Sequence, residues 1–251
     1  MQSYQTLSAQ VYQLDKPIGC SFGDVEYYAA RLSGVVGKIL EPAVGTGRIL
    51  IPLLQQGYDI YGFDCSAPML KICQQNLSHY AFDQERVHMA QFENFLTEQR
   101  YAAIIIPTGS FLLLDDEDKA IAALQQCYQS LQSGGRLIFD IFFQHQFKLG
   151  QSSVKTFDCL NDQLISLTMT ASEIDYVQQV TTTHHRYDLW DKTGNCIQSE
   201  LEVFKLKWFG LSELKRILNE IGFRDIQFSA DYQYLASVQN QSQVITVEAS
   251  K

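Results

Sequence analysis

Short apolar runs alternate with helix-like segments through the first 145 residues of the chain, and this alternation constrains the fold most strongly. Five runs have the length and composition of strands, at residues 37–42, 58–63, 86–90, 101–107 and 136–143. Helical patterns separate them, at about residues 48–56, from Ser66 onward, and at 116–131. Runs such as 101-YAAIIIP-107 are apolar throughout, which indicates strands that are covered on both faces. The pattern therefore predicts a mostly parallel sheet with helices on both sides.

Capping and stop signals refine these boundaries. Ser66 is a favoured N-cap residue with Pro68 in the first turn behind it. Asp24 is expected to cap a helix over residues 24–34, and Ser212 to cap one over 211–223. Two further strands near residues 223–229 and 243–249 rejoin the sheet, which makes the expected fold an α/β, Rossmann-like sheet of seven strands.

The sequence pattern changes after Gly150. Residues 153–209 carry long polar–apolar alternations rich in Thr, Val, Ile and Tyr, and 191-DKTG-194 separates two of them as a hairpin turn. We therefore expect an antiparallel insertion of three or four strands at residues 151–209. The α/β domain would comprise residues 1–150 and 210–251.

The first strand–helix turn, 41-EPAVGTG-47, is the first place to look for a ligand, because ligands bind beyond the carboxyl ends of parallel strands. Gly45 and Gly47 permit a tight turn and a close approach of backbone to ligand. A dinucleotide site requires a third glycine where this chain has Leu50, and no GK[ST] follows that would make a phosphate-binding P-loop. An S-adenosylmethionine site instead requires an acidic residue at the strand end for the ligand's ammonium group, and Glu41 stands there.

Asp64 lies 19 residues after Gly45, at the end of the second strand. A carboxylate at this place accepts hydrogen bonds from both hydroxyls of a ribose, and each such charge-assisted bond is worth roughly 1.5–3 kcal/mol. Dinucleotide sites use the same device, so Asp64 does not discriminate between the two cofactors.

The segments EPAVGTG, FDCSAPML and IIIPTGSF, in this order of elements, resemble the class I S-adenosylmethionine-dependent methyltransferases. The resemblance covers about residues 20–145 and 205–249. It implies that the first turn holds the methionine and ribose side of S-adenosylmethionine, through Glu41, Ala43, Gly45, Thr46 and Gly47. It further implies the ribose diol at Asp64, adenine at Cys65, Met69, Gln91 and Phe92, and the methyl group at Pro107, Thr108 and Ser110. Gln91 stands where the family usually has an acidic residue, and its side-chain oxygen accepts the same hydrogen bond.

The end of the fourth strand bears on the methyl acceptor. Enzymes that methylate amide or base nitrogens have [ND]-P-P-[YF] there, whereas this chain has 106-IPTGSF-111. The net charge of −9 also opposes the approach of nucleic acid or an anionic membrane. A small-molecule acceptor is therefore expected, bordered by Thr108 and Ser110 and by a lid of aromatic residues, Tyr12, Phe22 and Tyr28.

An alcohol or phenol acceptor needs a general base, and three histidines are candidates: His145, His184 and His185. Neighbouring residues on a strand face opposite sides, so only one of His184 and His185 can reach a given pocket. Holding acceptor and methyl group in line can itself supply about 7–11 kcal/mol, so a base is not essential.

The sequence thus predicts a cytoplasmic enzyme that transfers the methyl group of S-adenosylmethionine to a nitrogen or oxygen of a small molecule. The insertion would cover the acceptor pocket and could form a homodimer interface. Two alternatives stay open: a non-catalytic methyltransferase-like protein that binds S-adenosylmethionine, and an NAD-dependent oxidoreductase. No metal is expected, because the five His and six Cys lack ligand spacing. The first 15 residues do not have the pattern of a signal peptide, and no run is long enough to span a membrane.

Overall fold

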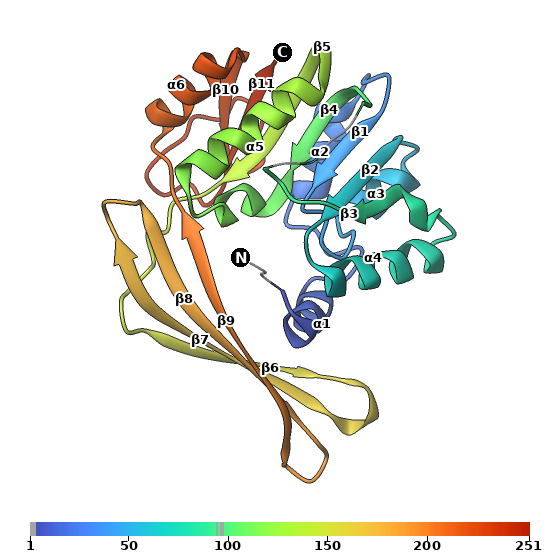
Figure 1. Cartoon of the computed structure of the whole chain (residues 1–251), viewed down its shortest axis with the longest axis vertical. Helices are drawn as coiled ribbons and strands as arrows, with labels where there is room; N and C mark the ends of the chain where they lie inside the picture. Colours follow the sequence, from blue (N-terminus) through green and yellow to red (C-terminus); the bar gives the residue numbers. More distant parts are fainter. Residues whose placement is uncertain (1–3, 94, 96–97) are drawn as a thin grey trace.

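The computed structural model describes residues 4–93, 95 and 98–251. Two sheets organise this part of the chain (Figure 1). One has seven strands in the order β10-β11-β5-β4-β1-β2-β3, and the other has four in the order β6-β7-β8-β9.

The seven-stranded sheet is mostly parallel, as predicted. Its strands are β1 (Ile39–Pro42), β2 (Ile60–Asp64), β3 (Val87–Met89), β4 (Tyr101–Ile106), β5 (Leu131–Ile141), β10 (Arg224–Ala230) and β11 (Ile245–Ser250). Strands β1 to β5 pair in parallel, and β11 is antiparallel to both β5 and β10. The strand order changes direction at β1, which places a ligand crevice at the carboxyl ends of β1, β2 and β4.

Helices cover both faces of this sheet. They are α2 (Asp24–Leu32), α3 (Leu50–Gln55), α4 (Ala67–His79), α5 (Glu117–Ser130) and α6 (Leu211–Ile221). In β4, Ala103 and Ile105 pack into the core under α2, α3 and α4. Ile104 and Ile106 pack into the other core, under α5 and α6. Because every residue of β4 is buried, the strand reads as a continuous apolar run.

The predicted caps are correct for one helix and wrong for two. Ser66 caps α4, and its Oγ accepts a hydrogen bond from the Met69 N–H at 3.2 Å. The N-cap of α2 is Gly23, because the Asp24 side chain is buried in an ion pair with Arg48. The N-cap of α6 is Gly210, whose N–H donates to Glu213 at 2.9 Å, so Ser212 lies inside the first turn.

The insertion forms the four-stranded sheet, as predicted. Its strands β6 (Ser152–Asp158), β7 (Leu164–Asp175), β8 (Val180–Trp190) and β9 (Cys196–Lys207) pair in sequence order and are all antiparallel. The Gly194 N–H donates to the Asp191 carbonyl at 3.0 Å, which closes the predicted hairpin between β8 and β9. The sheet is long and curved, and it extends away from the main domain (Figure 1).

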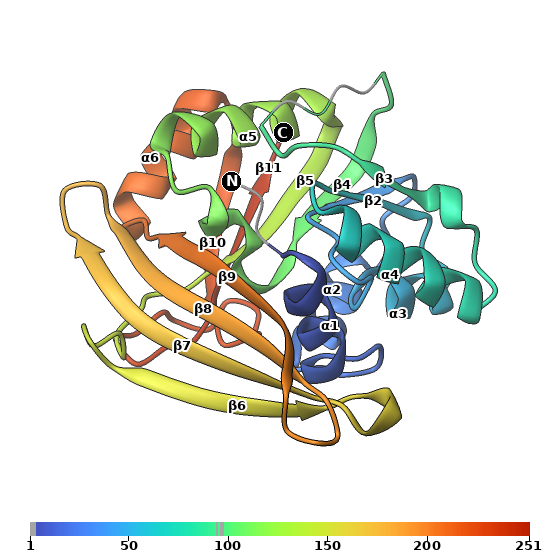
Figure 2. The same ribbon diagram turned by 60° about the horizontal axis from the view of Figure 1, so that its bottom comes forward.

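Helix α1 (Thr6–Asp15) is an element that the sequence pattern did not predict. It lies between the insertion and the main domain (Figure 2) and contacts α4 on one side and β6 and β8 on the other. Two carboxylates of β9 cap its N-terminus. Glu202 accepts from the Gln5 N–H at 2.6 Å, and Glu200 accepts from the Leu7 N–H at 2.7 Å. Glu202 lies 197 positions after Gln5 in the sequence, and Glu200 lies 193 positions after Leu7, so no local sequence signal marks the helix start.

Candidate functional site

A cavity of about 330 Å³ opens at the carboxyl ends of the parallel strands. Its walls come from three parts of the chain. The strand ends of the main sheet contribute Ala43, Gly45, Asp64, Cys65, Gln91, Phe92, Thr108, Gly109 and Ser110. The N-terminal segment contributes Tyr4, Tyr12 and Lys16, and β9 contributes Phe204 and Leu206. Residues from both the α/β domain and the insertion therefore border one space.

Asp64 ties the first two strand–helix turns together at the cavity wall. Its Oδ2 accepts from the Gly45 N–H at 2.9 Å, and its Oδ1 accepts from the Ser66 N–H at 2.8 Å. Burial raises the pKa of this carboxyl group, and the backbone hydrogen bonds from Ser66 and Gly45 oppose that rise. Each carboxylate oxygen has a second lone pair, so Asp64 can still accept hydrogen bonds from ligand hydroxyls.

Glu41 is a buried carboxylate at the end of β1 and is only 3% exposed. Its Oε2 has no hydrogen-bond partner within the described part of the chain. Burial raises its pKa well above the usual range, and the positive charge of Arg48 opposes this rise. The side chain lies behind the cavity wall rather than in it. A buried carboxylate oxygen without a partner is costly, and a cationic ligand group would relieve that cost.

The three residues from Gly45 to Gly47 have different surroundings. Gly45 lies on the cavity wall, with φ 57°. Thr46 is fully buried and does not line the cavity; its carbonyl accepts from Asn76 at 2.9 Å. Gly47 has φ 85°, and a Cβ there would lie 2.9 Å from the Cys73 Sγ. Gly47 therefore permits the packing of α3 on α4, and of the three predicted cofactor contacts only Gly45 lies at the cavity.

The residues predicted for adenine lie together on one side of the cavity. Cys65, Met69, Gln91 and Phe92 all line it. The Phe92 ring stands edge-on to Phe63, with centroids 6.1 Å apart, which anchors one wall in the core. An aromatic ring and an amide side by side suit a flat heterocycle with an exocyclic amine.

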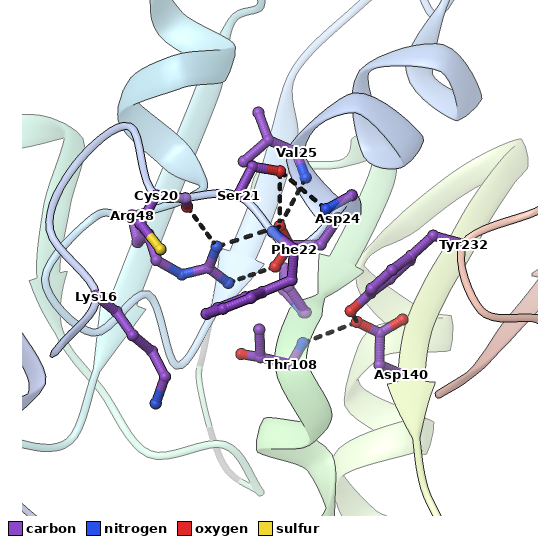
Figure 3. A network of polar contacts seen from close by, with 12 residues as sticks. Lys16, Cys20, Ser21, Phe22, Asp24, Val25, Arg48, Thr108, Asp140 and Tyr232 are labelled. Carbon is purple, nitrogen blue, oxygen red and sulfur yellow. Dashed lines mark hydrogen bonds and ion pairs between the residues drawn. The ribbon is translucent and has the colours of Figure 1, made fainter. Parts of the chain in front are cut away.

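The turn after β4 has an unusual backbone. Thr108 (φ 56°, ψ 25°) and Gly109 (φ 73°, ψ 18°) are both left-handed. This conformation costs a residue with a Cβ about 1–2 kcal/mol. The Asp140 carboxylate of β5 accepts from the Thr108 N–H at 2.8 Å, as Figure 3 shows. Thr108, Gly109 and Ser110 line the cavity, whereas Pro107 is buried and does not.

The three candidate histidines do not form part of the cavity wall. His145 and His184 are exposed. His185 faces the opposite side of β8, as the strand alternation predicts, and stacks on Phe204 with ring centroids 4.7 Å apart. Burial lowers the pKa of His185 to about 4. No general base from this set therefore reaches the cavity directly.

Only one of the three predicted lid aromatics lines the cavity. Tyr12 lies on its wall, and Tyr4, which the sequence analysis missed, meets it edge-on at 5.8 Å. Tyr28 is fully buried in the core, so its predicted acceptor contact is wrong. Phe22 is 55% exposed and lies against the Arg48 guanidinium, away from the wall.

Arg48 and Asp24 form a buried ion pair beside the first turn that the sequence analysis also missed (Figure 3). The Arg48 side chain is 2% exposed and also donates to the Cys20 carbonyl at 3.0 Å. Burial alone would raise the pKa of Asp24, but the hydrogen bond and charge of Arg48 hold it below its usual value. The pair fastens the segment before α2 to the turn that carries Gly45.

Comparison with known proteins agrees with this geometry. Residues 39–135 match the family described as a methyltransferase domain. A glycine/sarcosine N-methyltransferase from Aphanothece halophytica is 28% identical over 204 residues, which cover 78% of this chain and 69% of the relative. The CcbJ methyltransferase from Streptomyces caelestis has the same fold, with a TM-score of 0.75, 21% identity, and coverage of 99% of this chain and 97% of that one. The sugar N-methyltransferase KedS8 from a Streptoalloteichus species also has a TM-score of 0.75, with 18% identity over 98% and 94% of the two chains.

Fold, cavity and family match together define the class of protein. The antiparallel strand β11, which pairs with β10 and β5, distinguishes this sheet from the parallel sheet of a dinucleotide-binding fold. The methyltransferase domain at residues 39–135, the curated relatives and the shared fold together indicate a class I S-adenosylmethionine-dependent methyltransferase. The prediction of family, fold and cofactor is thereby confirmed, and the oxidoreductase alternative is not supported.

Proposed function

We propose that this protein transfers the methyl group of S-adenosylmethionine to the nitrogen of a small-molecule amine. The observation that carries the proposal is the single cavity that joins the strand ends of the methyltransferase domain to the insertion. One end suits the cofactor and the other is closed by α1 and β9.

The residues at the strand ends fit the cofactor. When bound, S-adenosylmethionine supplies a methyl group on a positively charged sulfur. Glu41 would accept a hydrogen bond from the ammonium group, which would satisfy its unpaired Oε2. Asp64 would accept from the ribose hydroxyls, and Gln91 with Phe92 would hold the adenine. The contact with Glu41 requires the ligand to reach behind the present cavity wall at Gly45.

The other end of the cavity suits an acceptor with an apolar body. Phe142, Phe204 and Leu206 form its walls. At its edge Asp115 meets Lys205 of β9, with Nζ and Oδ2 3.4 Å apart. These two charges join the α/β domain to the insertion. The separate sheet formed by β6 to β9 supports the proposed division into residues 1–150 with 210–251, and 151–209.

An amine suits this site better than an alcohol. An alcohol or phenol needs a base, and none of the three candidate histidines lines the cavity. A neutral amine attacks without further activation, so positioning and exclusion of water suffice. The names of two similar proteins, a glycine/sarcosine N-methyltransferase and a sugar N-methyltransferase, support a nitrogen acceptor.

Calorimetric titration tests the cofactor half of the proposal. S-adenosylhomocysteine should bind and NAD should not. Asp64→Ala should abolish binding, whereas Asp59→Asn, a change of an exposed carboxylate just before the start of β2, should not. Binding of NAD without binding of S-adenosylhomocysteine would contradict the proposal.

Turnover tests the acceptor half. Amino sugars, amino acids, phenols and carboxylic acids would be incubated with S-adenosylmethionine and examined by mass spectrometry for one added methyl group. Methylation of an amine supports the proposal, and methylation of a phenol alone would refute the choice of nitrogen. Cofactor binding without any turnover would favour the non-catalytic alternative.

We also propose a cellular location and an oligomeric state for the enzyme. We place it in the cytoplasm, since all six cysteines are free thiols. None of the helices in the described part of the chain is long and apolar enough to cross a bilayer. Homodimer formation through the insertion stays a prediction, supported by the exposed apolar side chains Ile197, Leu201 and Val203 on β9.

A further inference from the structure

The Asp140 carboxylate is fully buried at the carboxyl end of β5 and accepts three hydrogen bonds. Its Oδ2 accepts from the Thr108 N–H at 2.8 Å and from the Tyr232 hydroxyl at 2.9 Å. Its Oδ1 accepts from the Thr246 Oγ1 at 3.0 Å. Figure 3 shows the carboxylate between Thr108 and Tyr232. Asp140 is thus fixed by Thr246 of β11 and by Tyr232 in the loop after β10, and its contact with Thr108 reaches the turn after β4.

The strand register explains why this contact matters. In the β4–β5 pair Ile106 lies opposite Phe139, so Asp140 follows the last paired residue and stands beside the turn that begins after β4. That turn contains the two left-handed residues, Thr108 and Gly109. The backbone of Thr108 resists this conformation, and the Asp140 hydrogen bond is the polar contact that holds its N–H.

Phe142, the residue just after β5, supports the same turn. Side chains two positions apart on an extended segment point to the same side, which brings Phe142 under the turn together with Asp140. A Cβ at position 109 would collide with the Phe142 ring, so only glycine fits there. Phe142 also lines the cavity. The turn is therefore held at Thr108 by the hydrogen bond from its N–H to Asp140, and at Gly109 the Phe142 ring packs against it.

We propose that Asp140 is a positioning residue for methyl transfer, which fixes the Thr108–Gly109 turn as the cavity wall between cofactor and acceptor. This inference rests on the proposed function for its effect on catalysis. Asp140 does not line the cavity and acts only through the turn. The cofactor contacts come mainly from the ends of β1, β2 and β3, so loss of Asp140 should disturb alignment of the acceptor more than binding of the cofactor.

Three variants test the inference. Asp140→Ala removes the acceptor for Thr108 and should lower kcat by about 10- to 100-fold while the Kd for S-adenosylhomocysteine changes less than about threefold. Asp140→Asn should restore kcat, because its amide oxygen accepts from Thr108 and Tyr232 while its NH2 donates to the Thr246 hydroxyl. Thr246→Val is the matched control: it removes a hydrogen bond to the same carboxylate but leaves the turn untouched, so kcat should stay within about twofold.

The expected pattern is a loss in kcat that occurs in Asp140→Ala alone. Equal losses in Asp140→Ala and Thr246→Val would show that Asp140 serves stability only and would overturn the inference, as would an unchanged kcat in Asp140→Ala. A parallel loss of cofactor affinity would also overturn it.

Amide hydrogen exchange separates failure of this inference from failure of the proposed function. The Thr108 N–H should exchange slowly in the wild type and in Asp140→Asn, and at least about tenfold faster in Asp140→Ala. Equal exchange in all three proteins would overturn the role of Asp140 in holding the turn, even if no acceptor were methylated. A wild type that binds no S-adenosylhomocysteine would refute the proposed function instead.

Discussion

At the scale of single residues, two buried glutamates of the seven-stranded sheet, Glu41 and Glu248, have opposite environments. Glu248 of β11 is ion-paired with Arg31 and Arg136, each at 2.9 Å. Glu41 is more deeply buried, yet its Oε2 has no partner in the described structure. An unpaired buried carboxylate lowers the stability of the free protein and is tolerated where a ligand completes it. Glu41 therefore has the properties of a binding residue, and Glu248 those of a structural one.

We predict that Glu41→Gln weakens binding of S-adenosylhomocysteine by about 10- to 100-fold, because a charge-assisted hydrogen bond becomes a neutral one. The same change should raise the free energy of unfolding of the ligand-free protein, since burial disfavours the ionised form of Glu41 and a neutral amide does not carry that cost. Calorimetry and urea denaturation measure the two effects. Glu248→Gln is the control, which should lower stability and leave binding unchanged. Unchanged affinity in Glu41→Gln would contradict the assignment of Glu41 to the ammonium group.

At the scale of elements, helix α1 joins the insertion to the cofactor side of the cavity. Its N-terminus is capped by Glu200 and Glu202 of β9, and the Asn76 amide of α4 donates to Gln13 near its C-terminus at 3.1 Å. Its inner face places Tyr12 on the cavity wall. Carboxylates at a helix N-terminus are favourable because they satisfy free N–H groups and oppose the helix dipole.

We predict that the double variant Glu200→Gln and Glu202→Gln loosens α1. The loss of two charges should lower the local opening free energy by about 1–2 kcal/mol, seen as faster amide exchange across residues 6–15. Affinity for S-adenosylhomocysteine should fall as well, because Tyr12 moves with the helix. Leu201→Gln changes the opposite, exposed face of β9 and should have neither effect. Normal protection of α1 in the double variant would show that the two carboxylates do not hold it.

The same helix shows where sequence reasoning stops. Elements whose signals are local were predicted: the apolar strands, the Ser66 cap and the 191–194 hairpin. Helix α1 was missed because its caps are supplied by Glu200 and Glu202 from a distant strand. Asp24 was interpreted as a cap because the pattern does not reveal that Arg48 lies beside it in the fold. The cavity wall was foreseen at Asp64, Gln91 and Thr108, which follow strand ends, but not at Phe204, whose position depends on how the insertion folds back.

At the scale of the whole molecule, buried acids determine how stability depends on pH. Burial raises the pKa of Asp140 to about 6, against a usual value near 3.8. Its neighbours are the Thr108 N–H, the Thr246 hydroxyl, and the hydroxyls of Tyr28 and Tyr232, and burial raises the pKa of both tyrosines. Neither tyrosine titrates in the acidic range, so among these neighbouring groups Asp140 is the one whose charge changes at acidic pH.

The sign of the effect follows from linkage. Between about pH 4 and pH 6 the folded protein keeps a proton on Asp140 that the unfolded chain has lost, so the contribution of Asp140 to stability decreases as pH rises. A shift of about two pKa units corresponds to roughly 3 kcal/mol across this window.

We therefore predict that Asp140→Asn, which cannot ionise, flattens the pH dependence of the unfolding free energy of the ligand-free protein, measured by urea denaturation from about pH 4 to pH 7. Asp191→Asn is the control, since hydrogen bonds from Thr193 and Asn195 lower the pKa of Asp191 to about 2 and keep it ionised throughout. If Asp140→Asn has the same slope as the wild type, Asp140 ionises in the folded protein as readily as in the unfolded chain, and the buried network does not control its charge.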